Sequence, residues 1–116
     1  MTIKYTIRVR WIPDEGIYQG EVGFGLPCEE DSWYLDSMLR SSSCEVLDWK
    51  LIYNWGEHNK GYRWRSKIVA ESETSAEVAR QCRLHTEEVL ARIHEVVRRN
   101  REGFSHEQYI EEEVNI

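Results

Sequence analysis

Seven lysine and arginine side chains recur at alternate positions of segments typical of β-strands, and they form the clearest chemical pattern in this sequence. They are Lys4, Arg8, Arg10, Lys50, Arg63, Arg65 and Lys67. Because alternate residues of a strand share one face of a sheet, the pattern predicts a single basic face, opposed there only by Glu21 and Asp48. Arginine guanidinium groups hold phosphate or carboxylate oxygens with paired hydrogen bonds. This face is a candidate binding surface for phosphate, a nucleotide or an acidic protein segment.

The same seven residues also fit a surface that binds nothing. The solvent-exposed face of an antiparallel sheet is normally polar, and Lys or Arg on it discourages edge-to-edge aggregation. Nucleic acid is not the expected ligand, because the net charge is −6 and the aromatic residues on which bases would stack fall on the opposite side of the strands. At the level of sequence, the anion-binding surface and the plain solvated surface both remain open.

Cysteine and histidine spacing gives no support for a metal site, a cofactor or nucleophilic catalysis. Cys28, Cys44 and Cys82 contain no Cys-x-x-Cys pair. Cys82 and His85 share a helical face without a third ligand at a recognisable spacing, and His85 and His94 lie on opposite sides of the same predicted helix. No Gly-x-Ser-x-Gly, His-Glu-x-x-His or phosphate-binding loop occurs. We expect no metal, no cofactor and no enzymatic activity.

Length and composition predict one small globular domain. The chain has 116 residues, of which 41% are hydrophobic and 31% charged, and its five Trp and six Tyr supply large apolar areas to a thin core. An odd number of cysteines without a disulfide framework indicates a reducing compartment. The N-terminus lacks the apolar run of a secretion signal, and no stretch is long enough to cross a bilayer. We therefore expect a cytoplasmic protein without membrane contact.

Four segments alternate in hydrophobicity and predict two hairpins. The first turn is Pro13 to Gly16, and the second is Gly56 to Gly61. The alternation directs Trp49 and Trp64 toward the core. The predicted strands are Ile3–Trp11, Ile17–Phe24, Leu47–Trp55 and Tyr62–Ala70.

Two helices are predicted. Trp33, Leu35, Met38 and Leu39 favour a short one, and the capping box of Thr74 with a glutamate three residues later begins a long one that ends near residue 103. The long helix spans about 40 Å, more than four strands side by side can cover. This overhang predicts a homodimer through the helix or a sheet edge.

The predicted architecture is α+β: a four-stranded antiparallel sheet, with elements in the order β-β-short α-β-β-α, packed on one long C-terminal helix over residues 1–104. Residues 105–116 form an acidic tail, which could dock on the basic face of its own subunit or of a neighbour. The predicted function is a non-catalytic, small acidic binding or inhibitor module of the immunity-protein or phage anti-defence type. It acts on another macromolecule, and we expect that partner to be a protein. The alternative is a small-ligand binder that holds a phosphorylated metabolite or nucleotide on the basic face.

Overall fold

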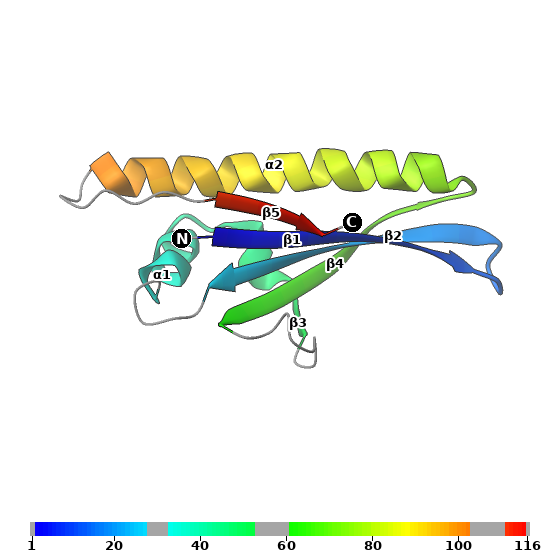
Figure 1. Cartoon of the computed structure of the whole chain (residues 1–116), viewed down its shortest axis with the longest axis horizontal. Coiled ribbons are helices and arrows are strands. Elements are labelled where there is room, and N and C mark those ends of the chain that lie inside the picture. The colour runs from blue at the N-terminus through cyan, green and yellow to red at the C-terminus, as the bar shows by residue number, and fades with distance from the viewer. Residues whose placement is uncertain (1, 28–32, 53–60, 103–110, 116) are drawn as a thin grey trace.

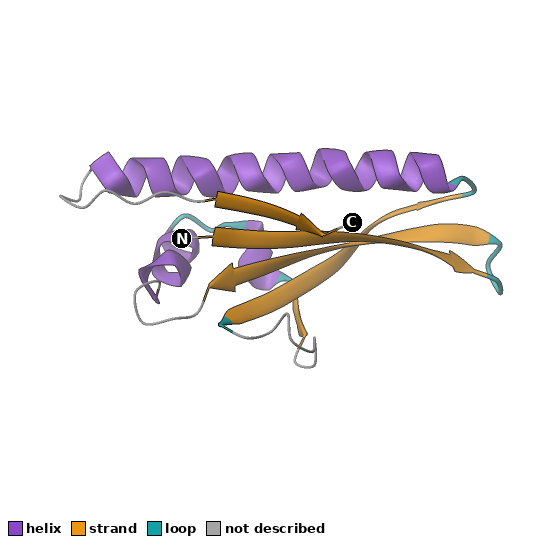
Figure 2. Ribbon diagram, viewed as in Figure 1, coloured by secondary structure: helices purple, strands orange, loops and turns teal. Residues whose placement is uncertain are grey.

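A computed structural model describes residues 2–27, 33–52, 61–102 and 111–115, with side chains for residues 3–27, 35–52 and 61–100. A single sheet forms one layer, and one long helix covers one of its faces (Figure 1, Figure 2). We call the covered face of the sheet the inner face and the opposite one the outer face. The elements are β1 (Thr2–Ile12), β2 (Ile17–Pro27), α1 (Trp33–Ser41), the 3-10 turn η2 (Glu45–Asp48), β3 (Lys50–Ile52), β4 (Tyr62–Ser72), α2 (Ser75–Glu102) and β5 (Glu111–Asn115).

The predicted α+β architecture is confirmed. The four predicted strands pair antiparallel in the order β3-β4-β2-β1, and the long C-terminal helix packs on them. A fifth strand was not predicted: β5, from the acidic tail, pairs with β1 in parallel, from Thr2 opposite Glu111 to Thr6 opposite Asn115. The described part of the tail therefore lies at the edge of the sheet of its own subunit.

The helix α2 begins where its capping residue predicts. The Thr74 Oγ1 accepts a hydrogen bond from the Glu77 backbone N–H at 3.3 Å, which satisfies one of the unpaired donors of the first turn. The carboxylate of Glu77 does not return the bond to the cap and instead accepts from Arg80 and Gln81. Within the described residues, α2 is the longest helix, and none is both long and apolar enough to span a membrane.

The helix α2 runs along the strands and not across them, and the end that extends past the strands lies over α1 (Figure 1). Its 28 residues span about 42 Å, against about 36 Å for each 11-residue strand. The remaining length packs on α1, whose Leu35 and Leu39 are fully buried. Buried side chains consequently extend along α2 from Val78 to Val97.

A β-bulge in β4 reverses the faces that the alternation predicts for its first half. Gly20 of β2 pairs with Ala70 and Glu21 pairs with Ile68, so Val69 is an extra residue. One inserted residue moves every side chain before it to the other face of the sheet. The prediction that Trp64 packs under the helix is therefore wrong: Trp64 is buried on the outer face.

The third strand begins later than predicted. Among the described residues Lys50–Ile52 pairs with β4, and Glu45–Asp48 forms the 3-10 turn η2 in place of extended chain. Trp49 nevertheless lies on the inner face as predicted, where its ring stacks on His85 of α2. The rest of the predicted strand and most of the second turn lie outside the described residues.

Candidate functional site

The seven basic residues that were predicted to share one face lie on two faces of the sheet. Residues paired across antiparallel strands point to the same side, and the register therefore decides each position. Arg65 is paired with Phe24, a core residue on the inner face, whereas Lys50 is paired with Ser66 on the outer face. The outer face holds Lys4, Arg8, Arg10 and Lys50, and the inner face holds Arg63, Arg65 and Lys67. The single basic face is thus a wrong prediction, and its cause is the bulge at Val69.

The two arginines of the inner face, Arg63 and Arg65, make contacts within the chain. The Arg65 Nη1 donates to the backbone carbonyl oxygens of Leu47 at 2.5 Å and Trp49 at 3.3 Å. The Arg63 Nη1 lies 3.1 Å from the Asp36 carboxylate of α1. These contacts tie η2 and α1 to the sheet, and both guanidinium groups are turned toward protein atoms.

On the outer face, side chains of neighbouring strands join the basic residues. Arg10 donates to the Gln19 amide oxygen at 3.2 Å, and Gln19 donates to the Glu71 carboxylate at 3.1 Å, which gives a polar ladder across β1, β2 and β4. The Lys4 Nζ lies 4.8 Å from the centre of the Tyr62 ring, within the range of a cation–π contact. Much of this face is therefore occupied by contacts within the sheet.

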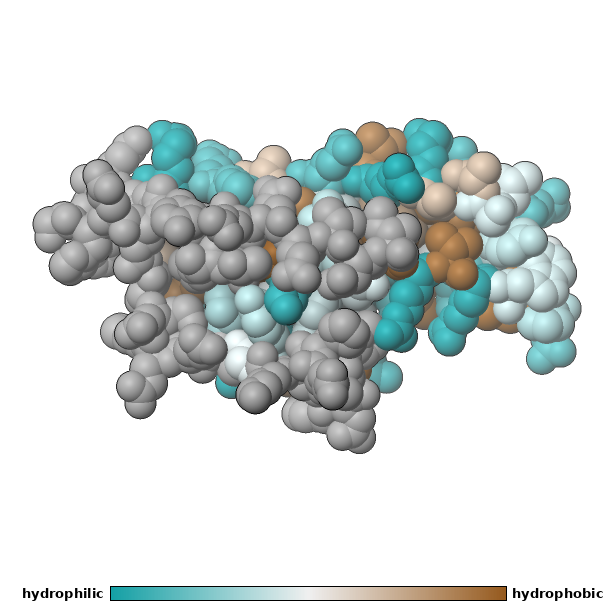
Figure 3. All heavy atoms as spheres, in the orientation of Figure 1, coloured by the Kyte–Doolittle hydropathy of each residue, from teal (hydrophilic) through white to brown (hydrophobic). Residues whose placement is uncertain are grey.

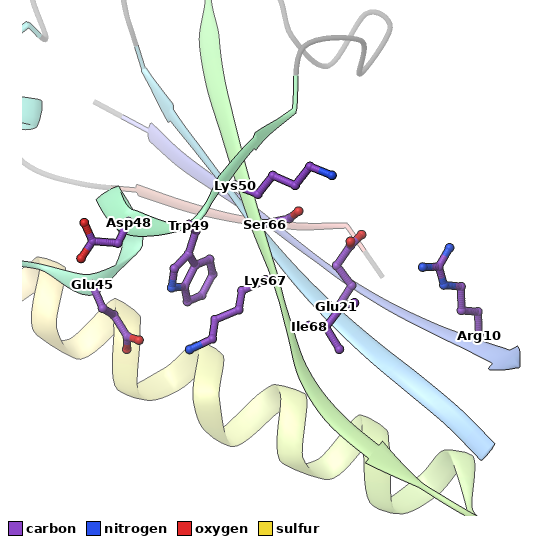
Figure 4. A pocket seen from close by; sticks show the side chains of 9 residues that line it. All are labelled: Arg10, Glu21, Glu45, Asp48, Trp49, Lys50, Ser66, Lys67 and Ile68. Carbon is purple, nitrogen blue, oxygen red and sulfur yellow. The ribbon is translucent and has the colours of Figure 1, made fainter. Parts of the chain in front are cut away.

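An open hollow of about 610 Å³ lies beside the edge of β4 that β3 leaves uncovered. Figure 4 shows that its lining side chains lie on both sides of β4, with Lys50 on one side and Lys67 on the other. Three cationic and three acidic side chains line it together with Trp49, so its charges balance. The lining residues are Arg10, Glu21, Glu45, Asp48, Trp49, Lys50, Ser66, Lys67 and Ile68.

Next to this hollow, Trp49 and His85 form a stacked pair. Their ring centres are 5.7 Å apart and the rings are inclined by 23°. The Trp49 Nε1 and His85 Nε2 are buried without a hydrogen-bond partner among the described residues, although the Glu45 carboxylate lies 3.7 Å from the His85 nitrogen. The sequence carries no signal for this pair, because η2 brings Trp49 to α2 from a distant part of the chain.

The two described cysteines lie in the core. Cys44 and Cys82 are buried free thiols, and burial raises the pKa of each because it disfavours the thiolate. Within residues 2–27, 33–52, 61–102 and 111–115, no group of three or more His, Cys, Asp or Glu side chains is placed to hold a metal ion.

The outer edge of β1 beyond β5 carries the most exposed apolar side chains of the sheet's first hairpin. Among the described residues β5 pairs with Thr2–Thr6, and we call residues 7–12, where no described strand pairs, the open edge of β1. Val9 is 36% exposed and Trp11 is 48% exposed, and the Trp11 ring packs on Tyr18 with centres 4.9 Å apart. Figure 3 shows apolar atoms bordered by hydrophilic ones over this part of the sheet.

The sequence gives no signal for this surface, because the alternation along Ile3–Trp11 puts Val9 and Trp11 on the same side of the strand as the core residues. Both residues do fall on the inner face, since Val9 is paired with Gly20, which lies against α2. Their exposure results from the position of β1 near the sheet edge, which the alternation of residues does not report. Comparison with known proteins found no matching family model, no matching curated protein and no matching solved structure.

Proposed function

We propose that this chain is a non-catalytic interaction protein that binds another protein through the open edge of β1. The observation that supports the proposal is the exposure of Val9 and Trp11 side by side at that edge. Exposed apolar groups that lie together on a soluble protein mark interaction surfaces. Tryptophan is also the residue type most enriched among those that dominate binding energy.

The charges around this surface favour an acidic module with a locally basic binding edge. The chain carries a net charge of −6, yet the exposed residues between the apolar ones on β1 are Arg8 and Arg10. A basic edge of this kind attracts a partner whose surface is locally acidic, which speeds the encounter of the two proteins and orients them. An inhibitor of the immunity-protein or phage anti-defence type, which works by covering a partner's surface, is the subclass we propose.

The alternative function, a binder of phosphorylated metabolites or nucleotides, loses its main support. It relied on seven basic residues on one surface, and the register divides them between two. Arg63 and Arg65 contact α1 and η2, and the one hollow described beside β4 has as many acidic as basic side chains. We therefore do not retain it beside the protein-binding function.

The experiment is a quantitative comparison of cross-linked partners from a lysate of the source cells, with wild type, Trp11→Ser and Leu84→Ser as baits. Leu84 is the matched control, because it is 47% exposed on α2 and its loss removes a similar apolar side chain elsewhere. We expect one partner that wild type and Leu84→Ser recover equally and that Trp11→Ser loses. Recovery by Trp11→Ser at the wild-type level, with all three baits folded, would count against the proposal.

A further inference from the structure

We infer that the open edge of β1 accepts an added β-strand: an extended segment of the partner in which acidic residues alternate with apolar ones. This inference rests on the proposed function, and it adds the mode of binding and the chemistry of the partner. Addition of a strand to a sheet edge gives affinity through backbone hydrogen bonds and specificity through alternate side chains.

The backbone of β1 is suited to such pairing. β5 already pairs along Thr2–Thr6, which shows that this edge accepts a strand, and no strand described in the structure continues that pairing beyond Thr6. β1 pairs with β2 without a register shift through Ile12, so the open edge is regular. The edge of β4 that β3 leaves uncovered contains the bulge at Val69, and bulges protect edges from added strands.

Basic and apolar side chains alternate along the open edge, and this alternation indicates which residues a partner strand would carry. Arg8 and Arg10 point to the outer face, and Val9 and Trp11 point to the inner face. Opposite charges and apolar groups placed directly across a strand pair stabilise it, whereas like charges destabilise it. A strand with acidic residues opposite the two arginines and apolar residues opposite Val9 and Trp11 satisfies both rules.

On the neighbouring part of β1, β5 meets this rule at two of its five register positions and departs from it at Glu112, which is the register partner of Ile3. Its Glu113 is the register partner of Lys4, and its Val114 is the register partner of Tyr5. The chain's own tail thus places an acidic residue across from a basic one and an apolar residue across from an aromatic one. A partner strand on residues 7–12 would extend this pattern along the same edge.

A second copy of the chain is a poorer occupant of this edge. A symmetric antiparallel pair centred on Val9 would set Arg8 of one copy opposite Arg10 of the other. A pair centred on Arg10 would set the two Arg10 side chains opposite each other. Both arrangements bring like charges together, which destabilises the pairing. A pair centred on Trp11 avoids this but would use only Arg10–Ile12 of each strand, because β1 ends at Ile12. We therefore assign the edge to a different protein.

Four synthetic peptides test the inference on the intact chain. The first is an acetylated, amidated hexapeptide that alternates Val and Glu, and the second carries Lys in place of Glu. The third and fourth are Val/Glu peptides with N-methyl groups on one or the other set of alternate backbone amides. We expect the first alone to shift the backbone amide resonances of residues 7–12 and to slow their hydrogen exchange. Equal binding of the N-methylated peptides would overturn strand addition, because they cannot complete the backbone ladder.

Variants of the chain then test the assigned side chains. Trp11→Ser should weaken binding of the Val/Glu peptide about tenfold or more, while Leu84→Ser should leave it unchanged. Arg10→Glu should weaken the Val/Glu peptide and create measurable binding of the Val/Lys peptide, because the charge across the strand is exchanged. If Arg10→Glu still bound the Val/Glu peptide in preference to the Val/Lys peptide, the assignment of an acidic partner strand would be contradicted.

Analytical ultracentrifugation of the chain alone tests whether a second copy of the chain, and not a different protein, occupies the open edge. A dimer that dissociates on the Trp11→Ser substitution would show that a second copy fills the edge, and this result overturns the inference. Loss of the cellular partner with Trp11→Ser, together with no binding of any peptide, would overturn strand addition and leave the proposed function standing. Binding of the Val/Glu peptide without a cellular partner that depends on Trp11 would overturn the proposed function and leave strand addition at this edge standing.

Discussion

Gly20 of β2 lies directly against Cys82 of α2, with no room between them for a side chain on the strand. A Cβ atom at position 20 would overlap the Cys82 Sγ and would lie 2.5 Å from the Val78 Cγ1. Glycine at this position therefore permits the close approach of helix and sheet. The same residue marks the bulge, since the register with β4 shifts immediately after it.

The substitution Gly20→Ala should destabilise the fold by about 1–3 kcal/mol, because overpacking forces the helix away from the strand. Urea denaturation followed by circular dichroism measures this change. In a double-mutant cycle, Cys82→Ala should recover part of the loss, since the smaller side chain gives the new methyl group space. Strictly additive effects of the two substitutions would show that the contact does not set the helix position.

The substitution Arg65→Leu should lower the free energy of unfolding by about 1.5–3 kcal/mol, because it leaves the Leu47 and Trp49 carbonyl oxygens without their charged donor. Lys67→Leu is the matched control on the same face of β4, and its effect should stay within about 0.5 kcal/mol. Urea denaturation compares the two variants. Equal stability of both would contradict the structural role of Arg65.

Acid should remove the stabilising contribution of Glu77. Hydrogen bonds from Arg80 and then Gln81 lower the pKa of this carboxyl from its ordinary value of 4.5 to about 2 in the folded chain. A carboxyl with a lowered folded-state pKa stabilises above its unfolded pKa, and the contribution disappears as the pH falls through the folded value.

The stability difference between wild type and Glu77→Gln should therefore be constant above about pH 5.5 and should shrink between pH 4.5 and 2. Thermal unfolding at a series of pH values measures it, and the effect will be small because the pair is exposed. Arg80→Met should remove most of this pH dependence. A difference that grows as the pH falls would contradict the assignment.

The thiols of Cys44 and Cys82 should resist modification in the folded chain. Burial raises the pKa of both, and the thiolate is the reactive form. In a Cys28→Ser variant, which retains only these two cysteines, a thiol reagent at pH 8 should label the native protein at least about tenfold more slowly than the urea-unfolded protein. Similar rates in both states would show that the two side chains are accessible.

The sequence was sufficient for the four antiparallel strands, the two helices and their order, but not for η2 or β5. Period-two alternation identified the strands, and the Thr74 cap identified the start of α2, because both signals are local. The sequence did not predict which face of the sheet the residues of β4 before the bulge occupy, because the extra Val69 is recognisable only when the pairing with β2 is known. The split of the basic residues follows from that single local event.

Local sequence patterns could not predict the candidate site either, because it also depends on contacts between distant segments of the chain. The open edge of β1 begins where the described pairing with β5 ends, at Thr6 and Asn115, and that pairing joins segments more than 100 residues apart in the sequence. The placement of Arg65 beneath η2 depends in the same way on a turn that replaced the predicted extended segment. Sequence periodicity gives the face of a residue within its strand, but it does not give the strand's neighbours.

The most direct test of the binding edge is an isotope-filtered NOE spectrum of the labelled chain with the Val/Glu peptide. Cross-strand contacts between peptide backbone protons and those of β1 from Ile7 to Trp11 are the predicted result. Contacts to β4 around Lys67, or contacts to side chains without any backbone pairing, would contradict the account.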